Sequence, residues 1–408
     1  MLLSTTSRRN TLLRALEEAR AQTDRLFQSI RPEAIYRRPI QERHRLVFYL
    51  GHLEAFDWNQ ICRNSLSVPP FHREFDQLFE FGIDPEPGQL PGDAPSDWPS
   101  IGEIERYNAR VRGRIDSLLA EAPVDVVHIA LEHRLMHAET LAYLLHQLPY
   151  EDKVAPEVVK SLPPAPPVEP GMVRIPAGPT TLGKRRGEGF GWDNEFERHA
   201  VGVSDFHIGK YKVTNREYLE FVRAGAAPPL FWTRRGERWF WRGMFQEISL
   251  PLDWPVYVSR TEAAAYASFV NRDLPSEAQF HRAAYADREQ LFPWGDEAPD
   301  ASRGNFDFEW WDPIPVNATP AGDSASGVSQ LVGNGWEWTS TVFEPFAGFE
   351  PFPFYPGYSA NFFDGEHYVM KGGSPRTDQR LLRRSFRNWF RANYPYTYAG
   401  FRLVENRG

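Results

Sequence analysis

The octapeptide HRLMHAET, residues 133–140, carries two histidines four positions apart, followed by a glutamate. On a helix, residues four apart lie on one face, with their side chains about 5–6 Å apart. Two imidazole nitrogens at this spacing can bind the same metal ion. The spacing also fits a histidine pair on a solvated helix face, so both interpretations stay open. A third ligand must come from another element.

His52 is the candidate for that third ligand. It lies inside LVFYLGHLEAFDW (46–58), where an imidazole without a partner would cost stability. Packed against the segment that carries His133 and His137, it would complete a three-histidine set; the alternative is a core histidine with satisfied hydrogen bonds. Glu139 points away from the histidine face, so we expect it to hold an imidazole rather than the metal. A zinc hydrolase would read H-E-x-x-H, and this chain does not.

Helical spacing of apolar residues predicts the elements that position these histidines. It begins near Ser4 and continues to about Gln147, with the later runs at 43–62, 103–121 and 124–147. We therefore predict a four-helix bundle over residues 1–152. Residues 71–100 are rich in proline, glycine, aromatic and acidic residues. This stretch is predicted to be a long loop that could cover a site.

The rest of the chain has a different composition. Residues 153–170 are dense in proline, which predicts a semi-rigid linker. Residues 171–408 hold most of the 13 tryptophans in short segments separated by glycine and proline, which predicts an irregular α+β domain. Helices are predicted at 214–225, opened by Thr214, and at 260–272.

Composition restricts the class of protein. Hydrophobic residues make up 41% and charged residues 25% of 408 residues, as in soluble globular proteins. The net charge of −8 disfavours a nucleic-acid or anionic-membrane partner, although RLLRRSFRNWFR (380–391) is locally basic. The lone Cys62 allows no internal disulfide, and no stretch reaches the length of a membrane span. We expect a soluble cytoplasmic protein.

Five ordered segments carry a resemblance. They are RDLPSEAQFHRAAYA (272–286), FPWGDE (292–297), GNGWEWTST (333–341), MKGGS (370–374) and AGFRLV (399–404). In this order they resemble the signature blocks of the formylglycine-generating-enzyme-like fold, which is related to C-type lectins. Its copper-dependent oxidising members need a cysteine pair in this domain. This part of the chain contains no cysteine, so that activity is not expected.

Together with a DinB-like four-helix bundle carrying H-x-x-x-H-x-E, the chain resembles the ergothioneine synthase (EgtB-like) family. The resemblance implies iron(II) held by His52, His133 and His137, which leave metal positions open for substrates. It implies O2 and hercynine, Nα-trimethylhistidine, as substrates, with a chalcogen joined to the imidazole carbon. It also implies a hercynine pocket at Asn388 and Trp389. A tyrosine is expected near the iron, and the candidates are Tyr355 and Tyr358.

Four positions depart from the sulfur-using members of that family. Met136 and Phe56 stand where glutamine is common, and Phe390 and Tyr394 replace an acid and an arginine that bind γ-glutamylcysteine. Aromatic rings suit a sugar instead, because its C–H face stacks on them. The chain thus resembles the selenoneine synthase branch, whose donor is a selenosugar. The alternatives are a sulfoxide synthase using γ-glutamylcysteine or cysteine, and a non-catalytic lectin-like binding module.

Overall fold

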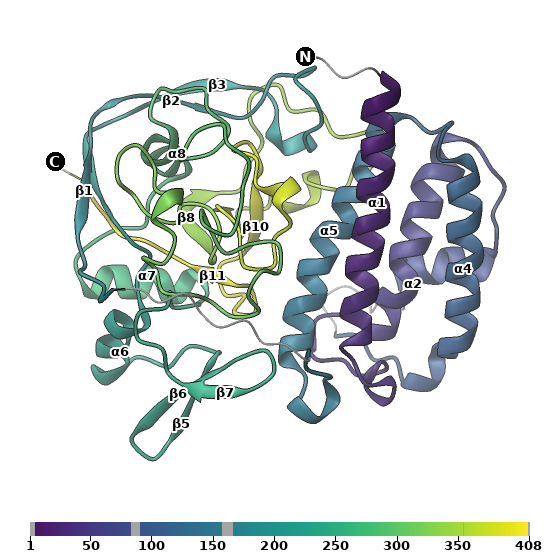
Figure 1. The fold of residues 1–408 in the computed structure, drawn as a ribbon, viewed down its shortest axis with the longest axis horizontal. Helices are drawn as coiled ribbons and strands as arrows, with labels where there is room; N and C mark the ends of the chain where they lie inside the picture. Colours follow the sequence, from purple (N-terminus) through teal and green to yellow (C-terminus); the bar gives the residue numbers. More distant parts are fainter. Residues whose placement is uncertain (1–4, 83–89, 157–165, 354, 407–408) are drawn as a thin grey trace. The chain divides into compact units, whose positions relative to one another are not determined.

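The computed structural model describes residues 5–82, 90–156, 166–353 and 355–406. The chain divides into two compact units, residues 1–158 and 159–408. Of the predicted linker 153–170, residues 157–165 lie outside the described residues. Figure 1 draws the first unit in purple and blue and the second in teal to yellow.

The first unit is a bundle of long helices (Figure 1). They are α1 (Thr5–Gln28), α2 (Leu46–Asp57), α4 (Ile101–Leu118) and α5 (Val124–Gln147), and a π-helix, Trp58–Ser65, continues α2. Helix α1 packs on α5, and α2 packs on both α4 and α5. Fully buried apolar side chains such as Leu16, Val111 and Ile129 fill the space between the helices. These helices match the predicted periodic runs.

A further helix, α3 (Arg73–Phe81), lies where the sequence predicted a loop, so that prediction was wrong for this stretch. The prolines and glycines that oppose helix all come after Phe81. The His72 ring accepts a hydrogen bond from the Phe75 N–H at 3.3 Å, which caps the first turn. Gly82, with a φ of 78°, ends the helix.

The second unit combines short strands with three helices among the described residues. The helices are α6 (Asn215–Arg223), α7 (Arg260–Phe269) and α8 (Glu277–Tyr285). One sheet has the order β10-β9-β8-β11, from Asn388–Arg391, His367–Lys371, Trp336–Val342 and Ala399–Gly400. A second has the order β1-β4-β12, from Met172–Ile175, Phe206–Gly209 and Val404–Asn406.

Two smaller sheets complete this unit. Strands β2 (Gly178–Leu182) and β3 (His199–Val203) pair with each other, and β5, β6 and β7 form a hairpin sheet from Trp232–Arg235, Arg238–Arg242 and Glu247–Ser249. Short 3-10 helices occur in both units, at Pro32–Ala34, Pro95–Asp97, Tyr150–Asp152, Asp193–Glu195, Pro320–Gly322, Ala360–Phe362 and Gln379–Leu381.

The starts of α6 and α7 follow from their capping residues. The Thr214 hydroxyl accepts from the Glu217 N–H at 3.3 Å, and the Glu217 carboxylate accepts from the Thr214 N–H at 2.8 Å. Ser259 and Glu262 repeat this arrangement at α7. The helical region followed by a sheet-rich unit confirms the predicted α+β class. Within the described residues, no helix is both long and apolar enough to cross a bilayer.

Candidate metal centre

Three histidines from two helices of the first unit converge on one point. His52 comes from the middle of α2, and His133 and His137 come from α5. Their ligand nitrogens all lie within 4.8 Å of one another. The ring centroids are 5.2 Å apart for His52 and His133, 4.9 Å for His52 and His137, and 4.4 Å for His133 and His137. This spacing suits one shared metal ion.

The imidazoles of this cluster are held neutral. Burial lowers the pKa of His52 to about 4. Burial lowers the pKa values of His133 and His137 well below their ordinary value, and the neighbouring histidines lower them further. A neutral imidazole keeps the lone pair that coordinates a metal, so the cluster is ready to bind a cation at neutral pH.

A backbone carbonyl fixes the orientation of His52. Its Nδ1 lies 2.6 Å from the carbonyl oxygen of Phe79 in α3. Because a carbonyl only accepts, Nδ1 carries the proton and Nε2 is left to coordinate. His137 has a buried Nδ1 with no hydrogen-bond partner in the part of the chain that the structure describes. Neutral imidazoles and an orphaned buried nitrogen fit a divalent transition metal such as iron(II).

Arg134, which follows His133 in α5, connects this helix to α2. Its guanidinium is fully buried and donates to the Asp57 carboxylate at 2.7 Å and to the Leu53 carbonyl at 3.0 Å. It also donates to the Glu54 carboxylate at 3.1 Å. These bonds fix the position of His52 relative to His133. Glu54 and Asp57 lie within one apolar segment and Arg134 within another, and these buried charges could have indicated the contact from the sequence. No prediction was made from them.

The other candidate residues of the first unit lie around the same helices. The Phe56 ring stacks on His133, with centroids 3.4 Å apart and planes at 8°. It therefore covers one face of that imidazole. Met136 and Glu139 are both half-buried on α5. The proposed part of Glu139 in holding an imidazole stays a prediction.

In the second unit, the candidate tyrosines belong to an aromatic cluster. Tyr358 stacks on Trp192 at 3.8 Å and meets Trp389 edge-on at 5.2 Å. Tyr355 lies 5.7 Å from Tyr358, and burial raises its pKa. Trp389 also stacks on Phe343 at 4.2 Å. The structure thus brings Tyr355, Tyr358 and Trp389 together.

The candidates on β10 separate into two groups. Side chains alternate along a strand, so Trp389 points to one face, and Asn388 and Phe390 point to the other. The Phe390 ring stacks on Tyr394 at 5.0 Å with planes at 13°. The four candidates therefore divide into Trp389 on one face and, on the other, Asn388 beside the aromatic pair of Phe390 and Tyr394.

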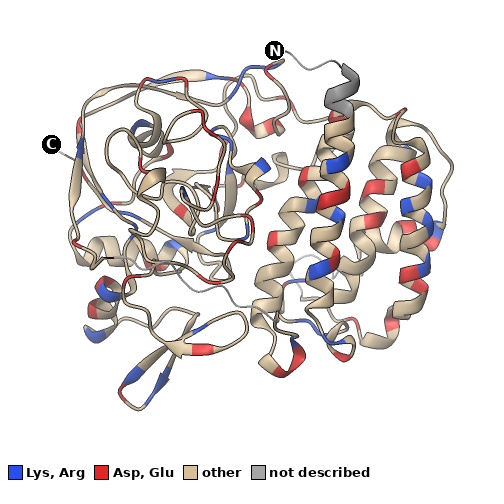
Figure 2. Cartoon of the chain, viewed as in Figure 1, with Lys and Arg blue, Asp and Glu red and all other residues tan. Residues whose placement is uncertain are grey.

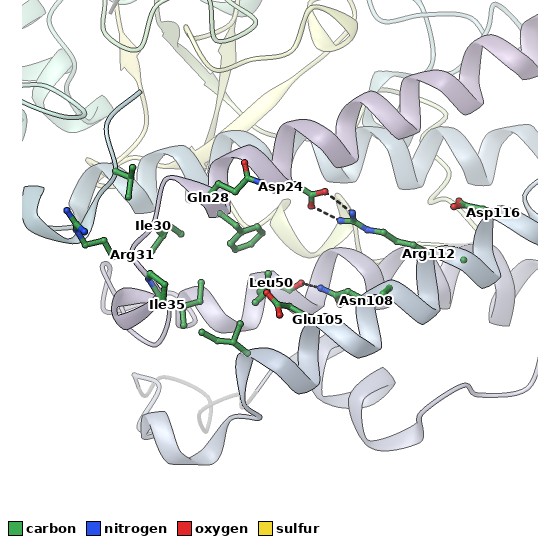
Figure 3. Close-up of a pocket in the computed structure, with 16 residues that line it drawn as sticks. Asp24, Gln28, Ile30, Arg31, Ile35, Leu50, Glu105, Asn108, Arg112 and Asp116 are labelled. Atoms are coloured by element: carbon green, nitrogen blue, oxygen red, sulfur yellow. Dashed lines mark hydrogen bonds and ion pairs between the residues drawn. The ribbon is translucent and has the colours of Figure 1, made fainter. Parts of the chain in front are cut away.

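The first unit also contains a cavity of about 840 Å³ (Figure 3). Its lining comes mainly from α4, the end of α1 and the segment 30–35, and none of the three histidines belongs to it. Its polar residues bond to one another: Arg112 donates to Asp24 at 2.7 Å, and Asn108 donates to the Leu50 carbonyl at 2.8 Å (Figure 3). Since these polar groups already bond within the chain, the histidine cluster remains the candidate metal site.

Comparison with known proteins places this geometry in context. Residues 159–407 match the family model of the sulfatase-modifying factor enzyme 1-like domain. Hercynine oxygenase of Mycolicibacterium smegmatis is 33% identical, covering 74% of this chain and 77% of that protein. Ergothioneine biosynthesis protein 1 of Neurospora crassa is 28% identical over 93% of this chain, which spans 56% of that relative. The solved structure of PvdO from Pseudomonas aeruginosa, at 22% identity and a TM-score of 0.43, covers 57% of this chain and 93% of that chain.

Proposed function

The chain belongs to the hercynine oxygenase family, and from this premise we propose that it is an iron(II)- and O2-dependent enzyme that joins hercynine to a selenosugar. The observation that carries the proposal is the buried cluster of His52, His133 and His137. Iron(II) bound there would supply the redox chemistry that a reaction with O2 requires. The chain holds its three ligand rings neutral and oriented.

The proposed reaction balances in atoms and electrons. Hercynine gives up the hydrogen of its imidazole carbon, and the selenol of the donor gives up its Se–H hydrogen. A C–Se bond forms, one oxygen atom of O2 goes to selenium and the other leaves as water with the two hydrogens. O2 accepts the electrons released by formation of the C–Se bond and by oxidation of selenium. In the resulting selenoxide, water then cleaves the bond between selenium and the sugar, so the free sugar leaves and a selenenic acid remains. Two-electron reduction of this acid by an added thiol gives selenoneine and water.

We assign recognition of the trimethylammonium group of hercynine to Trp389. Asn388, the other residue expected in the hercynine pocket, points to the opposite face of β10, so the strand geometry supports Trp389 alone. A trimethylammonium group binds the face of an aromatic ring, which contributes about 0.5–2 kcal/mol. Trp389 lies in the aromatic cluster with Tyr358 and Phe343, so it is held rigidly by ring contacts at 5.2 and 4.2 Å. Tyr355 and Tyr358 are the proposed proton donors, because each offers a phenol beside that ring system.

The identity of the donor rests on Phe390 and Tyr394. Their rings stack on each other, and they present no charge to the ammonium and carboxylate groups of a peptide. A pyranose ring suits such an aromatic pair. Met136 and Phe56 add apolar side chains near the ligand helices, where a glutamine would bind polar groups.

The second candidate function is a sulfoxide synthase that uses γ-glutamylcysteine or cysteine. The relatives described above favour it, since they are known as hercynine oxygenase and ergothioneine biosynthesis protein 1. A non-catalytic lectin-like module is a third candidate. The converged three-histidine cluster argues against it, because a binding module has no use for three neutral imidazoles on one point, two of them buried and one half-buried.

A donor panel tests the proposal. Protein reconstituted anaerobically with iron(II) is mixed with hercynine, O2 and either 1-selenoglucose, γ-glutamylcysteine or cysteine, and products are identified by mass spectrometry. We expect turnover with selenoglucose. Turnover with a thiol donor but not with selenoglucose would establish the sulfur alternative, and no bound iron would favour the binding module.

A double variant makes the same test sharper. Phe390→Asp combined with Tyr394→Arg restores the charge pair of the peptide-using members. We expect this variant to lose activity with selenoglucose and to gain activity with γ-glutamylcysteine. The matched control is Phe390→Leu, which removes an aromatic ring without adding charge and is expected to weaken use of selenoglucose only.

A further inference from the structure

The basic segment 380–391 sends its arginines in different directions. Arg387 is buried against Glu277 at 3.2 Å, and Arg391 lies at the surface near Glu366 at 3.5 Å. The remaining three, Arg380, Arg383 and Arg384, line one pocket of the second unit. The proposed function uses none of these three residues.

This pocket, called here the arginine pocket, has a volume of about 350 Å³. Its walls come from segments that are far apart in the sequence: the end of β2 with the loop after it, the residue before β3, the segment after α8, and residues 379–385. Five cationic side chains line it, against two acidic ones, Glu188 and Glu289. The cationic residues are Lys184, Arg198, Arg380, Arg383 and Arg384.

Carboxylates neutralise only part of this positive charge. Arg383 donates to Glu195 at 2.8 Å, and Glu195 is completely buried behind it. Arg198 pairs with Glu289 at 2.5 Å, and Arg380 pairs with Asp378 at 3.0 Å. Glu195 and Asp378 are buried and hold Arg383 and Arg380 at the wall, whereas Glu289 is exposed and lines the pocket beside Arg198.

Arg384 is held differently. It donates to the carbonyl oxygens of Arg288 at 3.0 Å, Gln290 at 3.3 Å and Thr181 at 3.4 Å. Its guanidinium also lies over the Tyr285 ring at 4.4 Å. In the described ranges of the chain, this guanidinium donates to carbonyl oxygens and not to carboxylates. A guanidinium has five N–H donors, so this one keeps donors and a full charge for an anion.

The shape and charge of the pocket select a class of ligand. A volume of about 350 Å³ holds a small molecule. A polyanion is disfavoured because acidic and basic residues are mixed over the chain (Figure 2) and its net charge is −8. Several guanidiniums around one space match the oxygens of a phosphate, which accept paired N–H bonds. We propose that the arginine pocket binds the phosphate group of a small phosphorylated molecule.

Calorimetric titration of the full chain at constant ionic strength tests this site without reference to the proposed reaction. The probes are inorganic phosphate and glucose 6-phosphate, with glucose as the uncharged control. We expect saturable binding of at least one phosphate probe and none of glucose. Tighter binding of glucose 6-phosphate would identify an organic phosphate ester as the ligand, and equal binding would identify free phosphate.

Variants locate the binding. Arg384→Gln should weaken phosphate binding about tenfold or more, because a charge-assisted pair of hydrogen bonds is lost. Arg380→Gln provides a second test at the rim if Arg384→Gln does not fold, as judged by its thermal unfolding. Arg223→Gln is the matched control, since Arg223 is exposed and pairs only with Glu220 in its own helix among the described residues. No saturable binding to the wild type, or wild-type affinity in a folded Arg384→Gln or Arg380→Gln, would overturn the proposal.

Discussion

At the scale of single residues, one hydrogen bond settles which nitrogen of His52 is available to a metal. The Phe79 carbonyl holds the proton of His52 on Nδ1, which leaves the lone pair of Nε2 available to a metal ion. The pKa values of all three rings are lowered by burial. A site built this way binds a cation without first releasing protons.

Removing one ligand should abolish iron binding. We expect His52→Ala to retain no iron after anaerobic reconstitution and gel filtration, whereas the wild type retains a stoichiometric amount, as measured by plasma mass spectrometry. His128→Ala is the control, because His128 lies on α5 outside the cluster. Wild-type iron content in His52→Ala would show that this residue is not a ligand.

Arg134 should be the most costly charged residue of the bundle to remove. Its loss leaves the Asp57 carboxylate buried without that cation and deprives Glu54 of one of two arginines. We expect Arg134→Ala to lower the free energy of unfolding by about 3–5 kcal/mol in urea titrations.

Arg112→Ala is the comparison for this effect. Arg112 is partly exposed and pairs with Asp24, which is 42% exposed, and with the buried Glu54. Water can replace the pair with Asp24, and Glu54 keeps its bond from Arg134 when Arg112 is removed. A smaller loss of stability is expected. Equal losses in the two variants would contradict the role of Arg134 as the contact that fixes α5 on α2.

At the scale of elements, the close packing of α3 on α2 places Phe79 where its carbonyl orients His52 of the candidate metal centre. A Cβ atom on Gly51 would lie 2.5 Å from the Phe79 ring, so only glycine allows this contact. The same residue of α3 supplies the carbonyl that orients His52.

Gly51→Ala should therefore affect both stability and iron binding. We expect a loss of about 1–3 kcal/mol from overpacking, and a weaker affinity for iron as the Phe79 carbonyl is displaced. Gly113→Ala in α4 is the matched control, because its added Cβ meets nothing within 4 Å. This control should gain stability from helix propensity. Urea titration with iron competition checks both, and wild-type iron affinity in Gly51→Ala would contradict the argument.

In the second unit, β8 is tied to the segment after β11 by a buried ion cluster. Glu337 accepts from the Arg402 guanidinium at 2.7 and 2.8 Å and lies 3.2 Å from the Lys212 ammonium. Burial alone would raise the pKa of Glu337, but Arg402 and Lys212 outweigh it and lower the pKa below the ordinary value of 4.5.

A lowered carboxyl pKa gives the stability of this unit a definite pH dependence. The unfolded chain binds the proton first on acidification, so the contribution of Glu337 is complete above pH 4.5 and is lost as pH falls below it. Glu337→Gln should be less stable than the wild type by about 3–5 kcal/mol at pH 7. The difference should shrink at pH values below 4.5 in thermal unfolding. A difference that is independent of pH would contradict this account.

At the scale of the whole molecule, periodicity was enough to predict the long helices and the α+β class. It failed at α3, because the prolines and glycines that follow Phe81 made the whole connection look like a loop. The spacing of His133 and His137 is local, so the sequence could predict it. The Phe79 carbonyl and the Arg134 contacts join segments distant in sequence, and only the packed structure brings them together.

The substrate residues show the same limit. Asn388 and Trp389 were predicted to share the hercynine pocket, whereas a strand over Asn388–Arg391 sends their side chains to opposite faces. Short strands between glycines have no clear apolar alternation, so this division was not predicted. It separates the residue proposed for hercynine from the aromatic pair proposed for the donor.

A competition in one reaction tests the central claim most directly. Iron-loaded protein receives hercynine, O2, and equal concentrations of 1-selenoglucose and γ-glutamylcysteine, and the isotope pattern of the hercynine products is read by mass spectrometry. The account predicts products with the selenium isotope pattern, absent without iron and from the His52→Ala variant. Products that contain only sulfur would contradict it.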